Sequence, residues 1–191
     1  RDRPETLAHC LAALADQARR PDHIVLVDNG PDERNRDLLA ASEIPHTYLP
    51  SDTNLGGAGG FAYGILTARA LGADWVWLAD DDGLPGSDRT LATLLRCAQD
   101  KALDAVSPLV LDLADPERLA FPLRRGLTWA RTRADLEGLR FIPRVAQLFN
   151  GALFSARALN AVGVPDPRLF IRGDEVEVHR RMVPVSYTHL T

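Results

Sequence analysis

Apolar and polar residues alternate along the chain with two different periods. Between residues 3 and 18 the apolar positions recur every three or four residues, which predicts an amphipathic helix that starts near Pro4. Short apolar runs at 23–28, 46–50 and 74–80 are bounded by turn-forming residues and predict strands. The run DWVWLAD at 74–80 is the strongest of them, because aromatic and β-branched residues favour strands.

Helical periods and strand-like runs continue to alternate along the rest of the chain. The segments with a helical period are 34–42, 61–72, 87–101 and 172–182. Further strands are expected at 104–112 and at the start of 149–159, and the stretch between them is irregular and rich in arginine. Strand–helix alternation through residue 111 predicts βαβ units, an α/β fold and a mostly parallel sheet.

Composition and charge narrow the class of protein. The chain has 191 residues, of which 46% are apolar and 25% charged, as in ordinary globular domains. Its net charge of −4 argues against nucleic acid as a partner, since that would require a basic face. No apolar run reaches the ~18 residues of a membrane span, and no signal-peptide pattern opens the sequence. We therefore expect a cytoplasmic protein.

The two ends of the sequence depart from this pattern. No strand precedes the opening RDRPET, and Pro184 should end the last helix. The residues after Pro184 have neither helical nor strand continuity. We therefore expect one domain over 1–183 and a foreign tail over 184–191.

Three consecutive aspartates, Asp80, Asp81 and Asp82, follow the strongest predicted strand. In open α/β sheets, ligands bind beyond the carboxyl ends of the strands. Carboxylate oxygens suit Mg²⁺ or Mn²⁺, and in an extended segment Asp80 and Asp82 would face one site while Asp81 faces away. An acidic turn that precedes the next helix is the alternative interpretation.

The segment NLGGAGG at 54–60 predicts a glycine loop that brings the backbone close to a ligand or only allows a tight turn. It also nearly matches a dinucleotide-binding fingerprint, with Asp80 at about the distance of the ribose-binding acid. Two features argue against a nicotinamide-dependent enzyme. The preceding strand is weak and ends in Pro50, and the fingerprint requires one acid rather than three.

Two other segments carry candidate chemistry. Asp174 and Glu175 begin the last predicted helix, where they either stabilise the positive end of the helix dipole or supply a general base. The segment LRRGLTWARTR at 123–133 contains four arginines and no acid. It is either a solvated face or a surface that meets phosphate or a membrane, and its Trp129 is a candidate acceptor-side aromatic.

Four motifs, HIVLVDNG, NLGGAGGF, WLADDDG and LFIRGDEVEVHRR, together resemble the family 2 glycosyltransferases in order and spacing, over residues 1 to about 183. The resemblance is closest to actinobacterial cell-wall galactofuranosyltransferases that begin galactan on a rhamnosyl lipid-linked acceptor. Bacterial rhamnosyltransferases that use dTDP-rhamnose are the alternative. The resemblance implies the GT-A (nucleotide-diphospho-sugar transferase) fold, a Rossmann-like, mostly parallel central sheet flanked by helices. The family's first strand has no counterpart before Arg1.

The resemblance also implies roles for individual residues. Glu175 would be the catalytic base, with Asp174 beside it, and Asp80 and Asp82 would bind Mn²⁺ or Mg²⁺. The expected donor-binding residues are Arg3, Asp28, Asn54, Gly56, Gly57, Asp80 and Asp81. The expected acceptor-side residues are Trp129, Phe149, Asn150 and Gly151.

The implied reaction is inverting, metal-dependent transfer of galactofuranose from UDP-galactofuranose to a rhamnosyl or galactofuranosyl lipid-linked cell-wall acceptor. The implied partners are this UDP-sugar donor and lipid-linked glycan acceptor, with peripheral association at the inner face of the cell membrane and the oligomeric state left open. A later histidine that completes the family's metal shell has no counterpart before residue 183. A non-catalytic nucleotide-sugar-binding fragment is therefore a second hypothesis.

Overall fold

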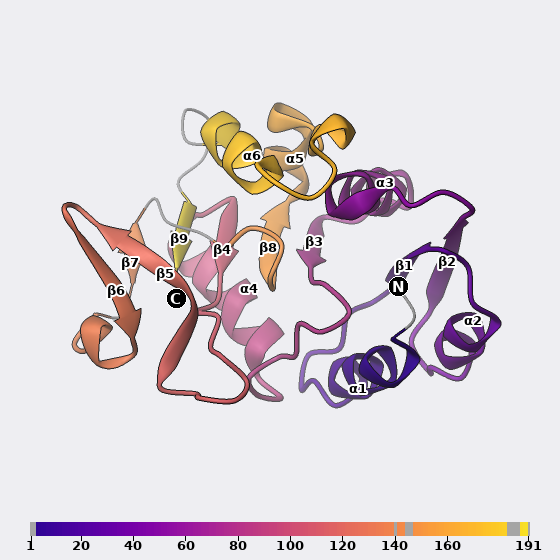
Figure 1. Ribbon diagram of the computed structural model, residues 1–191, viewed down its shortest axis with the longest axis horizontal. Helices are drawn as coiled ribbons and strands as arrows, with labels where there is room; N and C mark the ends of the chain where they lie inside the picture. The colour runs from indigo at the N-terminus through magenta and orange to yellow at the C-terminus, as the bar shows by residue number, and fades with distance from the viewer. Residues whose placement is uncertain (1–2, 140, 144–146, 183–187, 191) are drawn as a thin grey trace.

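The structure is a computed structural model that describes residues 3–139, 141–143, 147–182 and 188–190 (Figure 1). Its first half contains α1 (Pro4–Ala15), β1 (Ile24–Asn29), α2 (Glu33–Ala40), β2 (His46–Ser51), α3 (Gly56–Ala70), β3 (Trp75–Leu78), α4 (Thr90–Asp100) and β4 (Ala105–Ser107). Its second half contains β5 (Arg118–Arg125), β6 (Thr128–Thr132), η1 (Ala134–Leu136), β7 (Ile142–Pro143), β8 (Ala152–Ser155), α5 (Ala156–Val162), η2 (Pro167–Leu169), α6 (Asp174–Met182) and β9 (Thr188–Leu190).

The strands form two sheets and a separate hairpin. β1 and β2 pair in parallel, as predicted, and the five-stranded sheet has the order β3-β8-β4-β9-β7. The α/β class is confirmed, but the directions in the larger sheet are mixed, because β8 lies antiparallel between β3 and β4. A helical crossover normally returns the chain to the start of a parallel strand. Here the chain passes through the β5–β6 hairpin between β4 and β8, which allows β8 to run in the opposite direction.

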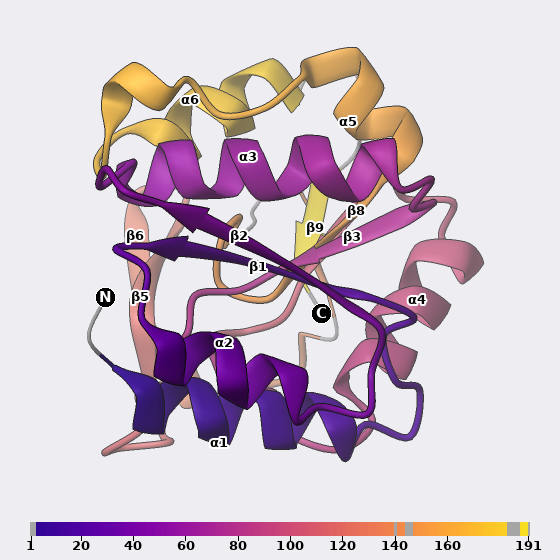
Figure 2. The same cartoon turned by 90° about the vertical axis from the view of Figure 1, so that its right-hand side faces the viewer.

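Helices cover both faces of the sheets. Figure 2 shows α3, α5 and α6 on one side of the strands and α1, α2 and α4 on the other. Alternate residues of β3 divide between these layers, because Val76 packs with the α3, α5 and α6 side chains while Trp75 and Trp77 pack with those of α4. In β8, Phe154 and Leu153 divide in the same way, and each is only 1% exposed. Side chains therefore pack on both faces of β3 and β8.

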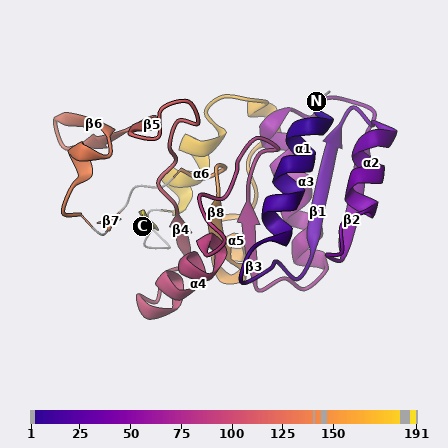
Figure 3. The same ribbon diagram turned by 90° about the horizontal axis from the view of Figure 1, so that it is seen from below.

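The β5–β6 hairpin has a small core of its own. Leu119, Leu123, Ala130 and Leu136 are buried together there. Figures 1 and 3 place the hairpin at one end of the molecule, with α1, α2 and α3 at the other end.

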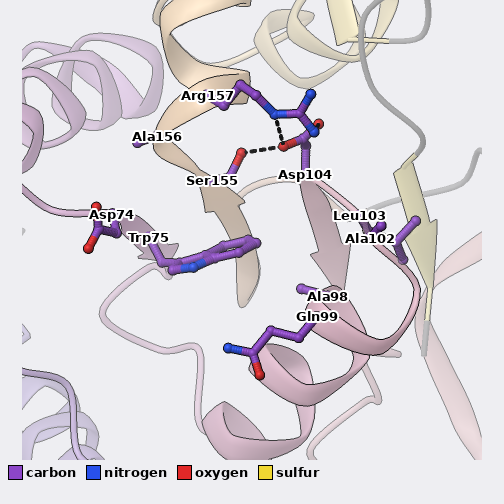
Figure 4. A pocket seen from close by; sticks show the side chains of 10 residues that line it. All are labelled: Asp74, Trp75, Ala98, Gln99, Ala102, Leu103, Asp104, Ser155, Ala156 and Arg157. Carbon is purple, nitrogen blue, oxygen red and sulfur yellow. Dashed lines mark hydrogen bonds and ion pairs between the residues drawn. The ribbon is translucent and has the colours of Figure 1, made fainter.

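A cavity of about 420 Å³ lies beside the start of β3, the loop between α4 and β4, and the start of α5 (Figure 4). The buried Asp104 carboxylate accepts hydrogen bonds there from the Ser155 hydroxyl at 2.6 Å and from Arg157 at 2.5 and 3.1 Å. The Ser155 oxygen in turn accepts from the Ala158 amide and caps α5. These bonds fix the strand ends opposite to those that carry Asp80 and its neighbours.

Two further observations concern the ends and the helices. Residues 188–190 form β9 between β4 and β7, and the expectation that 184–191 is foreign sequence stays a prediction. Among the helices of the described residues, none combines the length and apolar character that crossing a bilayer requires.

Candidate functional site

Five chain segments meet at one edge of the structure. They are the carboxyl ends of β1 and β3, the first turns of α3 and α6, and the residues that lead into β8. The strand ends follow the rule that predicted a site at this edge. Most of the predicted site residues lie on these segments.

Asp28 lies buried at the end of β1. Its Oδ2 atom accepts hydrogen bonds from the Tyr48 hydroxyl at 2.8 Å, the Asn35 amide at 3.0 Å and the Asp32 backbone at 3.2 Å. Burial and the bond to Asp28 raise the pKa of Tyr48 to about 12, so this phenol stays protonated and donates. The predicted donor-binding carboxylate therefore also joins β1, β2 and the start of α2.

The glycine segment forms the first turns of α3, not the loop that the sequence predicts, because the helix begins at Gly56 instead of near Phe61. The Asn54 side chain accepts from the Gly56 amide at 3.0 Å. Asn29, which sequence reasoning missed, accepts from the Leu55 amide and donates to the Gly56 carbonyl. These bonds provide partners for backbone groups that would otherwise be unpaired where the helix begins. The glycine segment can therefore be helical.

Gly56 is required where α3 meets the loop before α6. Its φ is +67°, and a Cβ atom there would lie 2.3 Å from the Phe170 carbonyl oxygen. The same oxygen accepts from the Ala58 amide at 3.0 Å, and Phe170 itself has a φ of +58°. Gly57 faces α6, since a Cβ atom at Gly57 would lie 4.0 Å from the Asp174 carboxylate. The predicted donor-side glycines therefore lie beside the predicted catalytic acids.

The three aspartates form a turn, which corrects the expectation of an extended segment. The Gly83 amide donates to the Asp80 carbonyl at 3.0 Å, and this bond bends the chain directly after β3. Asp81 and Asp82 consequently share one partner, because the Arg3 guanidinium donates to both at 2.6 Å. The bond to Asp82 is the main cause of the raised pKa of Arg3. Arg3 thus brings the start of α1 to the acidic turn.

Asp80 is the first residue of this turn. Its side chain still reaches solvent, yet the protein packed around it raises its pKa to about 6, with further increases from Asp82, Asp81 and Glu175 and an opposing effect of Arg3. The influence of Glu175 means that the turn after β3 and the first turn of α6 share one electrostatic environment. A cation at this turn would relieve the crowding of negative charge.

The predicted catalytic acids occupy the first turn of α6. Asp174 is only 6% exposed. Burial and then the charge of Asp174 raise the pKa of Glu175, while a backbone hydrogen bond from Phe149 lowers it. A carboxylate with a raised pKa is a stronger base than an ordinary glutamate, which suits proton abstraction.

The predicted acceptor-side residues separate into two groups. Phe149 stacks on Phe61 of α3 with ring centroids 4.5 Å apart, and the Gly151 amide donates to the Leu78 carbonyl at 2.7 Å. The segment formed by Phe149, Asn150 and Gly151 therefore lies close to the end of β3 in space. Trp129 instead lies on the β5–β6 hairpin, and among the described contacts none joins it to the acidic residues.

The described residues contain no group of three or more His, Cys, Asp or Glu side chains arranged to hold a metal ion. Asp80 and Asp82 nevertheless offer carboxylate oxygens, and Mg²⁺ typically keeps several waters and takes one or two carboxylates plus substrate phosphates. The turn already attracts positive charge, because Arg3 binds two of its acids. These residues therefore fit a divalent cation that completes its shell with substrate oxygens.

A mixed α/β sheet with an acidic turn after β3, near paired acids at the start of α6, is the arrangement expected of GT-A sugar transferases. The chain belongs to the Glycosyltransferase like family 2, which matches residues 1–186. This membership does not support the nicotinamide-dependent alternative for the glycine segment.

Curated relatives share more than half of the sequence. The chain is 56% identical over 187 residues to galactofuranosyltransferase GlfT1 of Mycolicibacterium smegmatis, with 95% of this chain and 62% of the relative covered. It is 57% identical over 186 residues to GlfT1 of Mycobacterium tuberculosis strain CDC 1551, with 95% and 61% covered. The chain thus spans about three fifths of the length of these relatives.

Solved structures confirm the fold. Staphylococcus aureus TarS 1-349 matches with a TM-score of 0.72 at 12% identity, covering 98% of this chain and 54% of TarS. The mannosyltransferase PcManGT from Pyrobaculum calidifontis, solved with GDP-Man and Mn²⁺, matches with a TM-score of 0.67 at 14% identity, covering 98% and 51%. At these identities the likeness concerns the fold alone.

The contact between Gly56 and Phe170 leads to a stability prediction. Gly56→Ala and the control Gly126→Ala both place alanine at a positive φ, +67° and +60°, but only the first adds a Cβ against other atoms. We expect about 1–2 kcal/mol of destabilisation from the backbone in both and a further ~1–3 kcal/mol from overpacking in Gly56→Ala. Urea unfolding measures both values, and equal losses would contradict the close approach at Gly56.

Proposed function

We propose that the chain is the catalytic part of an inverting, metal-dependent glycosyltransferase. It transfers galactofuranose from UDP-galactofuranose to a rhamnosyl or galactofuranosyl lipid-linked cell-wall acceptor, as a peripheral protein at the cytoplasmic face of the cell membrane. The observation that carries the choice of sugar is the 56–57% identity to two galactofuranosyltransferases over 95% of the chain. The meeting of the acidic turn, α3 and α6 supports sugar transfer as the reaction.

In this proposal Asp80 and Asp82 hold Mn²⁺ or Mg²⁺. When bound, the cation would neutralise charge on the diphosphate leaving group. Arg3, already beside Asp82, can form charge-assisted hydrogen bonds with phosphate oxygens. The first turn of α3 provides the positive end of a helix dipole, which favours a diphosphate near Asn54, Gly56 and Gly57.

At the other side of the site, Glu175 takes the proton from the acceptor hydroxyl. Its raised pKa strengthens it as a base, and the Phe149 backbone orients its carboxylate. Attack by the deprotonated oxygen on the anomeric carbon inverts the configuration and releases UDP. Phe149, Asn150 and Gly151 would form the acceptor side, because they lie between β3 and the first turn of α6.

Donor screening combined with Glu175→Gln tests the transfer. We expect UDP release from UDP-galactofuranose with a rhamnosyl acceptor, and a rate about 10²–10⁴-fold lower in Glu175→Gln, because the amide cannot accept the proton. The variant should still bind UDP. Glu137→Gln, at an exposed glutamate outside the site, is the control.

Two outcomes would count against this assignment. Turnover of dTDP-rhamnose in place of UDP-galactofuranose would identify a rhamnosyltransferase. UDP binding without transfer from either donor would support the non-catalytic alternative.

Thermal unfolding tests the cation site. In the presence of Mn²⁺, UDP at about 100 times the dissociation constant of UDP should stabilise the chain by ~2.7 kcal/mol. This raises the unfolding temperature by roughly 5–10 °C in a chain of this size. Asp82→Ala should abolish the Mn²⁺-dependent part, because it removes a cation ligand. The exposed Asp88, beyond the turn, provides the control Asp88→Ala. Undiminished Mn²⁺-dependent protection in Asp82→Ala would refute the metal assignment.

A further inference from the structure

The β5–β6 hairpin carries an exposed surface to which the proposed reaction gives no role. A two-residue turn, Gly126 and Leu127, joins the strands, and the Leu127 side chain is 96% exposed. Trp129, one position into β6, is 55% exposed. Two large apolar side chains exposed within three residues make this end of the hairpin a candidate contact surface.

The strand pairing divides the hairpin into two faces. Leu123 pairs with Ala130, and both side chains are buried in the core of the hairpin. The next pair, Arg124 and Trp129, is exposed and therefore lies on the opposite face. Arg131 is also exposed and shares this face, because it is two residues beyond Trp129 on the same strand. The outer face thus presents an indole between two guanidinium groups, and Leu127 forms its tip.

The charge of this face is opposite to that of the whole chain. Residues 123–133 contain four arginines and no acid, whereas the chain has a net charge of −4. The nearest acids are occupied at the base of the hairpin. Glu117 lies 3.7 Å from Arg133, and the Asp135 carboxylate accepts from the backbone amides of Arg131 and Thr132. The outer face is therefore basic as well as apolar.

We propose that this face, formed by Arg124, Leu127, Trp129 and Arg131, docks on an anionic membrane surface. Leucine and tryptophan side chains enter the boundary between headgroups and acyl chains, and the arginines meet the lipid phosphates. An indole and arginines alone would also suit single-stranded nucleic acid, but the fully exposed aliphatic tip favours lipid. A second copy of the chain is less suited, because two such faces would bring their arginines against one another.

This inference rests on the proposed function, in which the acceptor is linked to a membrane lipid. It can fail separately, since vesicle binding is measured without donor or acceptor. Loss of sugar transfer with intact vesicle binding would count against the proposed function alone. Sugar transfer to a soluble acceptor without vesicle binding would count against the docking surface and the peripheral location, but not against the transfer reaction.

Co-sedimentation with vesicles tests the surface. We expect binding to vesicles of phosphatidylcholine with phosphatidylglycerol and little binding to phosphatidylcholine alone. Arg124→Gln and Arg131→Gln should each weaken binding about fivefold at low salt, since each removes one cation near the surface. Leu127→Asp should weaken it roughly tenfold or more by removing apolar contact and adding charge. Leu66→Asp on α3, where the leucine is 57% exposed, is the matched control and should bind like the unchanged chain.

Tryptophan fluorescence provides a second readout, which reports which side chain enters the lipid. Brominated lipids should quench Trp129, while Trp75 and Trp77 pack partly buried against α4. Trp129→Phe should keep most of the vesicle binding, because phenylalanine is also apolar, but should lose the quenching. Thermal unfolding checks that each variant remains folded, as expected for substitutions of exposed side chains.

Three results would overturn the proposal. One is absence of binding to anionic vesicles, and another is binding that the hairpin variants leave undiminished. The third is a hairpin-dependent association with RNA or with a second copy of the chain, in the absence of vesicle binding.

Discussion

Mutual repulsion among the carboxylates at the end of β3 is the constraint on which the arrangement of the site depends. Asp80, Asp81 and Asp82 directly follow β3. Because packing on both faces fixes the position of β3, the three carboxylates stay near one another. The turn directs Asp81 and Asp82 to Arg3 and leaves Asp80 beside the first turn of α6. Burial, together with the charges of Asp82, Asp81 and Glu175, raises the pKa of Asp80 and makes the turn receptive to a cation.

Close contacts between backbones transmit this arrangement to the neighbouring elements. The Phe170 carbonyl bonds to the first turn of α3, and Gly56 permits that approach because it lacks a side chain. The chain then enters α6 four residues later, which places Asp174 opposite Gly57. Asn29 holds the same end of α3 from the side of β1. The distance between the predicted donor-side glycines and the predicted catalytic acids is therefore set by backbone contacts.

The sequence indicated which segments form the site but not their local geometry. The position of Asp28 and of the aspartates at strand ends followed from apolar runs, since such runs locate buried strands well. The start of α3 was misplaced because glycine has a low intrinsic helix propensity, and bonds from Asn29, Asn54 and the distant Phe170 outweigh it here. The bonds from Asn29 and Phe170 join residues far apart in sequence, so no local pattern predicts them. The order and spacing of the motifs, not the periodicity, indicated the family.

The distribution of charge allows an acidic site and a basic docking surface to exist in one chain. A protein of net charge −4 is repelled by an anionic membrane unless positive charge is concentrated where contact occurs. At physiological ionic strength, charges interact over a Debye length of only ~8 Å. The hairpin lies at the opposite end of the molecule from α1, whose first turn follows the Arg3 that binds the acidic turn (Figure 1). Its arginines can therefore attract lipid phosphates without neutralising the carboxylates that a cation requires, and its separate core lets the tip project without disturbing β3.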